Sequence, residues 1–130
     1  MKASVLHKFC TPPIFEEIDD PVCGPNSVVI ELKACGVCRS DHHAWSGNDP
    51  DVKLPHIMGH ELAGIIVETG SDIKKFSIGD PVTVPFILGC GLCSDCQTGK
   101  STICDRQETI GFTIRGGFAQ FVEICFADFN

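Results

Sequence analysis

The chain contains the segment Gly89-Cys90-Gly91-Leu92-Cys93-Ser94-Asp95-Cys96-Gln97-Thr98-Gly99-Lys100, and a fourth cysteine follows at Cys104. The pattern C-x2-C-x2-C-x7-C lets successive thiolates turn inward around one ion, and four sulfurs complete the tetrahedral shell of a structural zinc. Such a closed shell leaves no position for a substrate, so we expect this zinc to stabilise a loop. The alternative is a set of free or disulfide-paired thiols.

Five further cysteines lie outside this segment. Charge interrupts the first eight residues before a signal-peptide apolar region could form, so we expect a cytoplasmic protein with reduced thiols. Cys10, Cys23 and Cys125 stand alone and are expected to be small buried hydrophobes. Cys35 and Cys38 form a C-G-V-C pair, but no thioredoxin-like βαβ pattern surrounds it. Spacing alone leaves the role of Cys38 open.

Length and charge exclude several classes of protein. A chain of 130 residues suits one domain, which we place at residues 1–130. Ten Lys and Arg against seventeen Asp and Glu, a net charge of -7, argue against a nucleic-acid binder. The longest apolar stretch, residues 62–67, is too short to cross a membrane.

The rest of the chain is typical of a mostly β domain with short helices. Alternation or β-branched runs predict strands at residues 28–33, 65–67, 82–84 and 118–124, with Gly- and Pro-containing turns between them. One short helix is expected to begin with Ser40 or Asp41 as its N-cap, to run through Trp45 and to end at Gly47. No G-x-G-x-x-G motif follows a strand, so a nucleotide-binding half is not expected.

Three motifs in order carry a resemblance to a known family. Gly36-Val37-Cys38-Arg39-Ser40-Asp41-His42-His43, then Gly59-His60-Glu61, then the four-cysteine segment resemble the zinc-dependent medium-chain alcohol dehydrogenases. The segments at residues 67–70, 79–82 and 116–121 are also similar to that family's N-terminal domain. The resemblance covers nearly the whole chain, but only the first part of such an enzyme. It implies a GroES-like, partly open β-barrel with a zinc-binding lobe.

The resemblance also implies a second, catalytic zinc. Cys38 and His60 match its ligands, Glu61 matches an acidic neighbour that we group with them, and Asp41 matches the carboxylate that hydrogen-bonds the ligating histidine. One thiolate and one imidazole leave the shell incomplete, so that water or a substrate oxygen can enter, while a carboxylate fixes the histidine tautomer. His56 lies near enough in sequence to be a stray ligand.

Further roles follow from the same resemblance. Ser40 matches the hydroxyl that begins a proton relay, which passes through the cofactor ribose to His43, and Arg39 matches a contact to the cofactor pyrophosphate. Phe86 resembles a wall of the substrate pocket. Simpler interpretations exist for each: a helix cap, a surface histidine, a solvated charge, and core packing for Phe86 and Trp45.

We therefore predict a fragment of a zinc-dependent oxidoreductase whose parent enzyme interconverts alcohols and aldehydes or ketones by hydride transfer to NAD or NADP. The family places a third zinc ligand and a Rossmann domain beyond position 130, so we expect this fragment alone to be inactive. We expect the full-length enzyme to be a homo-oligomer and the fragment to expose an apolar patch. One alternative is a zinc-stabilised β-barrel that binds a protein partner, which would not need Cys38, Ser40, Asp41 and His60 around one point. Another is a redox or zinc-storage protein, which does not account for Gly59-His60-Glu61.

Overall fold

Eight strands, two short α-helices and one 3₁₀ helix make up the computed structural model, which describes every residue from Met1 to Asn130. The class predicted from the sequence, mostly β with short helices, is confirmed. The strands are β1 (Lys2–Val5), β2 (Ile14–Glu17), β3 (Val28–Gly36), β4 (Glu61–Thr69), β5 (Pro81–Thr83), β6 (Ile87–Leu88), β7 (Glu108–Thr109) and β8 (Phe121–Ile124); the helices are α1 (Arg39–Ser46), α2 (Ser94–Gln97) and η1 (Ser101–Ile103).

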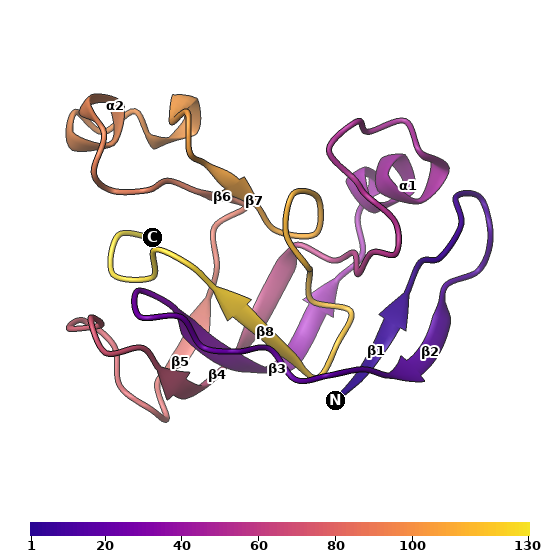
Figure 1. The fold of residues 1–130 in the computed structure, drawn as a ribbon, viewed down its shortest axis with the longest axis horizontal. Helices are drawn as coiled ribbons and strands as arrows, with labels where there is room; N and C mark the ends of the chain where they lie inside the picture. Colours follow the sequence, from indigo (N-terminus) through magenta and orange to yellow (C-terminus); the bar gives the residue numbers. More distant parts are fainter.

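The central sheet has the order β5-β4-β3-β8, with antiparallel neighbours (Figure 1). Strands β3 and β4 are nine residues each and pair from Val28↔Thr69 at one end to Gly36↔Glu61 at the other. The chain leaves β3 and enters β4 at the same end of the sheet. Residues just after Gly36 and just before Glu61 are therefore neighbours in space.

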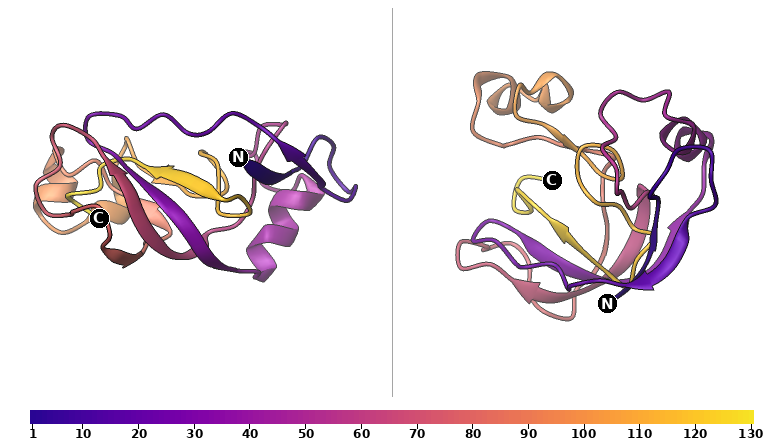
Figure 2. Two further views of the ribbon diagram at one scale, coloured as in Figure 1. Left: turned by 90° about the horizontal axis from the view of Figure 1, so that it is seen from below. Right: turned by 45° about the vertical axis from the view of Figure 1, so that its right-hand side comes forward.

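Two smaller sheets extend this frame. The β1-β2 pair is joined to the rest by single bridges, Ala3↔Ala119 and Leu6↔His56, so the sheets curve around a common interior without closing fully (Figure 2). The β6-β7 pair leads into a separate lobe, residues 89–104, that contains α2 and η1 and stands off the central sheet (Figure 1). We call this segment the zinc-binding lobe.

The main hydrophobic core lies on one face of the central sheet. Along β4, Leu62 and Ile66 are 3% and 1% exposed, while Val67 on the opposite face is 36% exposed, as the two-residue period of a strand requires. Ile30 of β3 and Val122 of β8 complete the same layer. None of the helices has the length and apolar content needed to cross a membrane.

The predicted strands are present, but most of their boundaries differ. The strands expected at residues 28–33 and 65–67 extend to Val28–Gly36 and Glu61–Thr69, because cross-strand pairing continues past the β-branched positions. The strand expected at 82–84 lies one residue earlier, at Pro81–Thr83. The strand expected at 118–124 is confined to Phe121–Ile124, because the backbone of Phe118 bonds to Met58 and Ser4 instead of to β3.

Two local predictions are wrong. The N-cap of α1 is Cys38, not Ser40 or Asp41; its sulfur accepts the Ser40 N–H, and Gly47 ends the helix with a φ of 75° as expected. Cys10 is exposed, not buried, because it occupies a left-handed turn with a φ of 59°. Cys23 and Cys125 are only half-buried.

The core layer leads to a stability prediction. Replacing the buried Ile66 by alanine removes methyl groups from a closely packed site and should lower the free energy of unfolding by about 2–5 kcal/mol. The matched change Val67→Ala, on the exposed face of the same strand, should cost less than about 1 kcal/mol. Chemical denaturation of the zinc-loaded chain measures both, and equal losses would contradict the assignment of the core face.

Candidate metal centres

Four sulfur atoms meet in the zinc-binding lobe. The Sγ atoms of Cys90, Cys93, Cys96 and Cys104 all lie within 4.8 Å of one another, and the Cys93 and Cys104 sulfurs are 3.7 Å apart. A tetrahedral zinc with Zn–S bonds of about 2.3 Å separates its sulfurs by about 3.8 Å. No cysteine of the chain forms a disulfide. The sulfurs thus have the arrangement of a four-thiolate metal centre.

Backbone and side-chain N–H groups surround these sulfurs. Cys93 is the N-cap of α2 and its sulfur accepts the N–H of Cys96 at 3.5 Å. Arg106 donates its backbone N–H to Cys104 Sγ at 3.3 Å and its Nη2 to Cys90 Sγ at 3.2 Å. Such donors stabilise ionised sulfur. Arg106 was not predicted from the sequence, although a cation two residues after Cys104 was a usable signal.

The pKa values of two of the four thiols are shifted in opposite directions. A backbone hydrogen bond from Leu92 lowers the pKa of Cys90 to about 6, whereas burial raises the pKa of Cys96 to about 12. Ionising every sulfur in this small volume therefore requires additional positive charge. A divalent cation supplies that charge and displaces the thiol protons, so the residues present fit a structural zinc.

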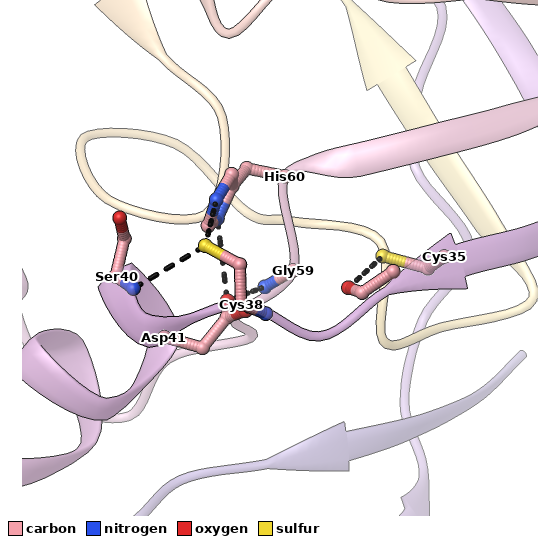
Figure 3. Close-up of polar contacts among 7 residues, drawn as sticks. Cys35, Cys38, Ser40, Asp41, Gly59 and His60 are labelled. Carbon is pink, nitrogen blue, oxygen red and sulfur yellow. Dashed lines mark hydrogen bonds and ion pairs between the residues drawn. The ribbon is translucent and has the colours of Figure 1, made fainter.

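A second group forms where β3 and β4 meet α1 (Figure 3). Cys38 Sγ lies 3.0 Å from His60 Nε2, and Asp41 Oδ1 lies 3.2 Å from His60 Nδ1. His60 and Asp41 are 7% and 5% exposed. The structure therefore brings together a thiol, an imidazole and a carboxylate that are up to 22 residues apart in sequence.

Asp41 holds this group in place through the backbone. Its Oδ2 accepts the N–H of Cys38 at 2.9 Å, and its Oδ1 accepts the N–H of Gly59 at 3.2 Å (Figure 3). The first bond completes the N-terminal cap of α1, and the second ties that cap to the residue before His60. One carboxylate thus fixes both chain segments, and it lies on the Nδ1 side of the imidazole, away from the sulfur.

Two observations test whether a metal ion fits here. The buried His60 Nδ1 has no properly angled hydrogen bond, although Asp41 Oδ1 is within ion-pair distance. The distance of 3.0 Å between Sγ and Nε2 is shorter than the roughly 3.5 Å that separates sulfur and nitrogen ligands around tetrahedral zinc. An imidazole with its proton on Nδ1, toward the carboxylate, presents the Nε2 lone pair to a metal. The donor set of Cys38 and His60 therefore fits zinc.

Two other candidate ligands lie outside this group. Glu61 is exposed at the start of β4, and its carboxylate rests against Gly36. His56 is buried beside Leu6, where burial lowers the pKa of its imidazole. The expectation that Glu61 neighbours the metal stays a prediction.

Helix α1 carries the remaining polar candidates. Ser40 lies in its first turn, and its backbone N–H donates to Cys38 Sγ at 3.3 Å, so Ser40 adjoins the second group (Figure 3). Arg39 and His43 are exposed and lie one helical turn apart on the same face. Arg39 forms no ion pair, and no hydrogen bond joins Ser40 to His43. The helix thus presents a free guanidinium next to the Cys38 cap.

Aromatic rings cover one side of His60. The ring centres of Phe86 and Phe112 lie 5.0 and 5.5 Å from that of His60. Phe86 is 41% exposed, so it borders the site and is not a core residue. Phe112 was missed because it lies in an irregular segment without a motif. Trp45 packs in a smaller core cluster and donates its Nε1–H to Thr11 O at 2.7 Å.

Comparison with known proteins supports the family resemblance that the motifs indicate. A family model described as "Alcohol dehydrogenase GroES-like domain" matches residues 24–127. An alcohol dehydrogenase of Geobacillus stearothermophilus is 39% identical over 123 residues, which are 93% of this chain and 36% of that protein. An NAD-dependent alcohol dehydrogenase of Sulfolobus acidocaldarius is 34% identical over 94% of this chain and 37% of its own length.

A solved structure with a similar fold indicates the same family as these relatives. The cobalt and zinc bound thermostable alcohol dehydrogenase of Pyrobaculum aerophilum matches 96% of this chain and 39% of its own, with a TM-score of 0.85 and 34% identity. This chain therefore spans little more than a third of the length of the proteins that it matches. The GroES-like fold expected from the sequence is confirmed, and the chain belongs to the alcohol dehydrogenase GroES-like domain family.

Proposed function

We propose that residues 1–130 form the GroES-like catalytic domain of a zinc-dependent oxidoreductase that interconverts alcohols and aldehydes or ketones by hydride transfer to NAD or NADP. The observation that carries this proposal is the 3.0 Å approach of Cys38 Sγ and His60 Nε2, with Asp41 on the far side of the imidazole. These two ligands leave coordination positions open for a substrate oxygen. The names of the similar proteins, including an NAD-dependent enzyme and a zinc-bound one, support the same reaction class.

The residues of this chain orient the centre and shield it. Cys38 and His60 would hold a zinc ion, and that ion would supply Lewis-acid chemistry at an alcohol or carbonyl oxygen. Asp41 favours the tautomer that leaves Nε2 free, because its carboxylate oxygen lies 3.2 Å from Nδ1 and attracts a proton to that nitrogen. Phe86 and Phe112 cover the imidazole with apolar rings and so reduce the access of water to it.

Residues of α1 have roles in proton transfer and in cofactor binding. Ser40 is half-buried beside Cys38, where its hydroxyl can take a proton from the substrate alcohol. His43 is exposed on the same helix, so its imidazole can pass a proton to solvent. A cofactor ribose bound between them would complete the relay that the family resemblance implies. Arg39 is exposed and free of ion pairs, and its guanidinium suits the pyrophosphate of a nicotinamide dinucleotide.

The two centres have different tasks. The four sulfurs of the zinc-binding lobe close the shell of their metal, so that ion stabilises the lobe without contacting substrate. A non-enzymatic protein-binding module would need this lobe but not the meeting of Cys38 with His60, and the family assignment does not favour it. A zinc-storage or redox protein leaves the same feature unexplained.

The remaining assignments rest on composition and family likeness. We propose a small-molecule alcohol or carbonyl as the substrate and a homo-oligomer as the full-length form. The net charge of -7 and the lack of a basic run support a protein that does not bind nucleic acid. We also propose a cytoplasmic location, in keeping with nine unpaired cysteines.

The zinc-binding lobe can be tested by its metal content. Cys96→Ser removes one of four closed-shell ligands, so the tightly held zinc should fall from about one ion per chain to a small fraction of that. The exposed Cys10→Ser is the matched control and should retain its zinc. Inductively coupled plasma analysis after dialysis measures both. Retention of tight zinc by Cys96→Ser, together with its loss from Cys38→Ser, would reverse the assignment of the two centres.

The second centre can be tested by the affinity of its more weakly bound zinc ion. Cys38→Ser should abolish binding of a second zinc, and Asp41→Asn should weaken it by about 10–100-fold, because the imidazole loses its orienting carboxylate. The exposed Asp51→Asn, which also removes a carboxylate, should leave the affinity unchanged. Titration with a zinc chelator measures the affinity. An unchanged second site in both Cys38→Ser and Asp41→Asn would exclude this group as a metal centre.

The reaction itself can be tested in the complete polypeptide that carries this chain. Zinc-loaded protein should reduce NAD or NADP in the presence of primary or secondary alcohols. Ser40→Ala should lower kcat by about 10²-fold or more without changing the metal content, because a proton acceptor is lost. Ser46→Ala, on the same helix, is the control and should retain activity. Absorbance of the reduced nicotinamide follows the reaction, and a zinc-loaded protein inactive with every alcohol and carbonyl would refute the proposal.

A further inference from the structure

A loop far along the chain contacts the segment that presents His60. The N–H groups of Gly116, Gly117 and Phe118 donate to the carbonyls of Ile57, Gly59 and Met58, at 2.7, 2.8 and 3.0 Å. We call residues 57–60 the His60 loop and residues 111–118 the glycine loop. These three hydrogen bonds between two irregular segments fix the backbone of residues 57–59, immediately before His60.

The contact is possible only without side chains at two positions. A Cβ atom at Gly116 would lie 2.5 Å from Met58 O and still closer to Gly59 O. A Cβ atom at Gly111, where φ is 75°, would lie 2.9 Å from Gly59 O. Both obstructing atoms belong to the backbone, so they cannot rotate away. A methyl group at position 116 would have to push the two loops apart by about 1 Å to reach ordinary contact distances.

Neither loop is free to yield elsewhere. On one side, the carbonyl of Phe118 accepts the N–H of Ser4 at 2.8 Å, and the glycine loop begins directly after Ile110, which is fully buried in the main core. On the other side, the N–H of Gly59 donates to Asp41. Separation of the loops therefore breaks their mutual bonds and moves the Gly59 peptide relative to the cap of α1.

Such a movement acts on the second metal centre but not on the first. His60 follows Gly59 directly, whereas its partner Cys38 is carried by α1 (Figure 3). Metal ligation tolerates deviations of only about 0.2 Å, so a shift of about 1 Å in one ligand is large. The four sulfurs of the zinc-binding lobe lie between residues 90 and 104 and have no part in this contact.

We propose that Gly116, assisted by Gly111, is a positioning residue for the Cys38–His60 centre: the missing side chains let the glycine loop hold Gly59 where His60 faces Cys38. The inference rests on the proposed metal-binding role of Cys38 and His60. It adds residues that touch neither metal nor substrate and that act on one ligand through its backbone.

Cobalt binding, measured beside retention of the first zinc and beside control variants, separates a local effect on the Cys38–His60 centre from general destabilisation. Chains carrying one zinc in the four-sulfur site are titrated with Co²⁺, and the thiolate-to-cobalt charge-transfer absorption reports the second ion at Cys38. Gly116→Ala should raise the dissociation constant of this ion by about 10–100-fold and shift its absorption bands, with the first zinc retained. Gly111→Ala should show the same change at a smaller amplitude.

Two glycines of this chain are matched controls. At Gly70 a Cβ atom would also meet backbone atoms, 2.6 Å from the carbonyl carbon of Pro25 and still closer to its oxygen, but at the end of the β3–β4 pair opposite to His60. Gly79 has a φ of 99° and open space around it, so alanine there adds backbone strain like that at Gly111 without a clash. Gly70→Ala and Gly79→Ala should bind the second cobalt ion as the parent chain does.

The outcomes separate this inference from the function on which it rests. If Gly116→Ala and Gly111→Ala bind the second cobalt ion like the parent while Cys38→Ser does not, the positioning role is wrong and the metal centre stands. If Gly70→Ala weakens the binding of the ion as much as Gly116→Ala does, the effect is general destabilisation and the positioning role is again wrong. If the parent chain itself binds no second ion, both proposals fail. Should Gly116→Ala lose its folded circular dichroism spectrum, the pair Gly111→Ala and Gly79→Ala decides.

Discussion

The pairing of β3 with β4 is the constraint on which the second metal centre depends. Eight residues of each strand pair, with the register shifting at Lys33 and at Val67, so that Gly36 lies opposite Glu61. The chain therefore leaves the sheet at Cys38 and returns to it at His60 from the same end, and α1 with the following loop fills the interval. A slip of one residue in the pairing would move every side chain of a strand to the opposite face of the sheet. The buried Leu62 and Ile66 therefore help to keep this register.

The two centres are built by opposite means. The zinc-binding lobe collects its four sulfurs from fifteen consecutive positions, 90–104, with turns and the N-cap of α2 directing them inward. The other centre takes its ligands from two strand ends and relies on Asp41, whose carboxylate accepts N–H groups from both segments. Local spacing suits a closed shell whose task is stability. Long-range assembly suits an open one, because neighbouring rings and backbone can shape the remaining face.

Local chemistry was recognisable in the sequence wherever a few neighbouring residues decide the structure. Gly47 ends α1 in the left-handed conformation that glycine favours, and the strand positions followed from β-branched residues. Cys38 as the helix cap was not predicted, because sulfur is a poorer cap than the hydroxyl of Ser40 or the carboxylate of Asp41 by propensity. Asp41 is instead committed to the backbone of Cys38 and Gly59, which a one-dimensional pattern cannot show.

By itself, the sequence indicated the four-cysteine cluster, the mostly β class and the family likeness, since each depends on short spacings or on residue types read in order. Only the tertiary structure decided that Cys38 and His60 lie 3.0 Å apart, that Phe112 covers the imidazole, and that Gly116 must lack a side chain. These features arise where segments separated by 22 to 58 positions meet. Their distances are set by strand register and by contact between backbones, which leave no periodic trace in the chain.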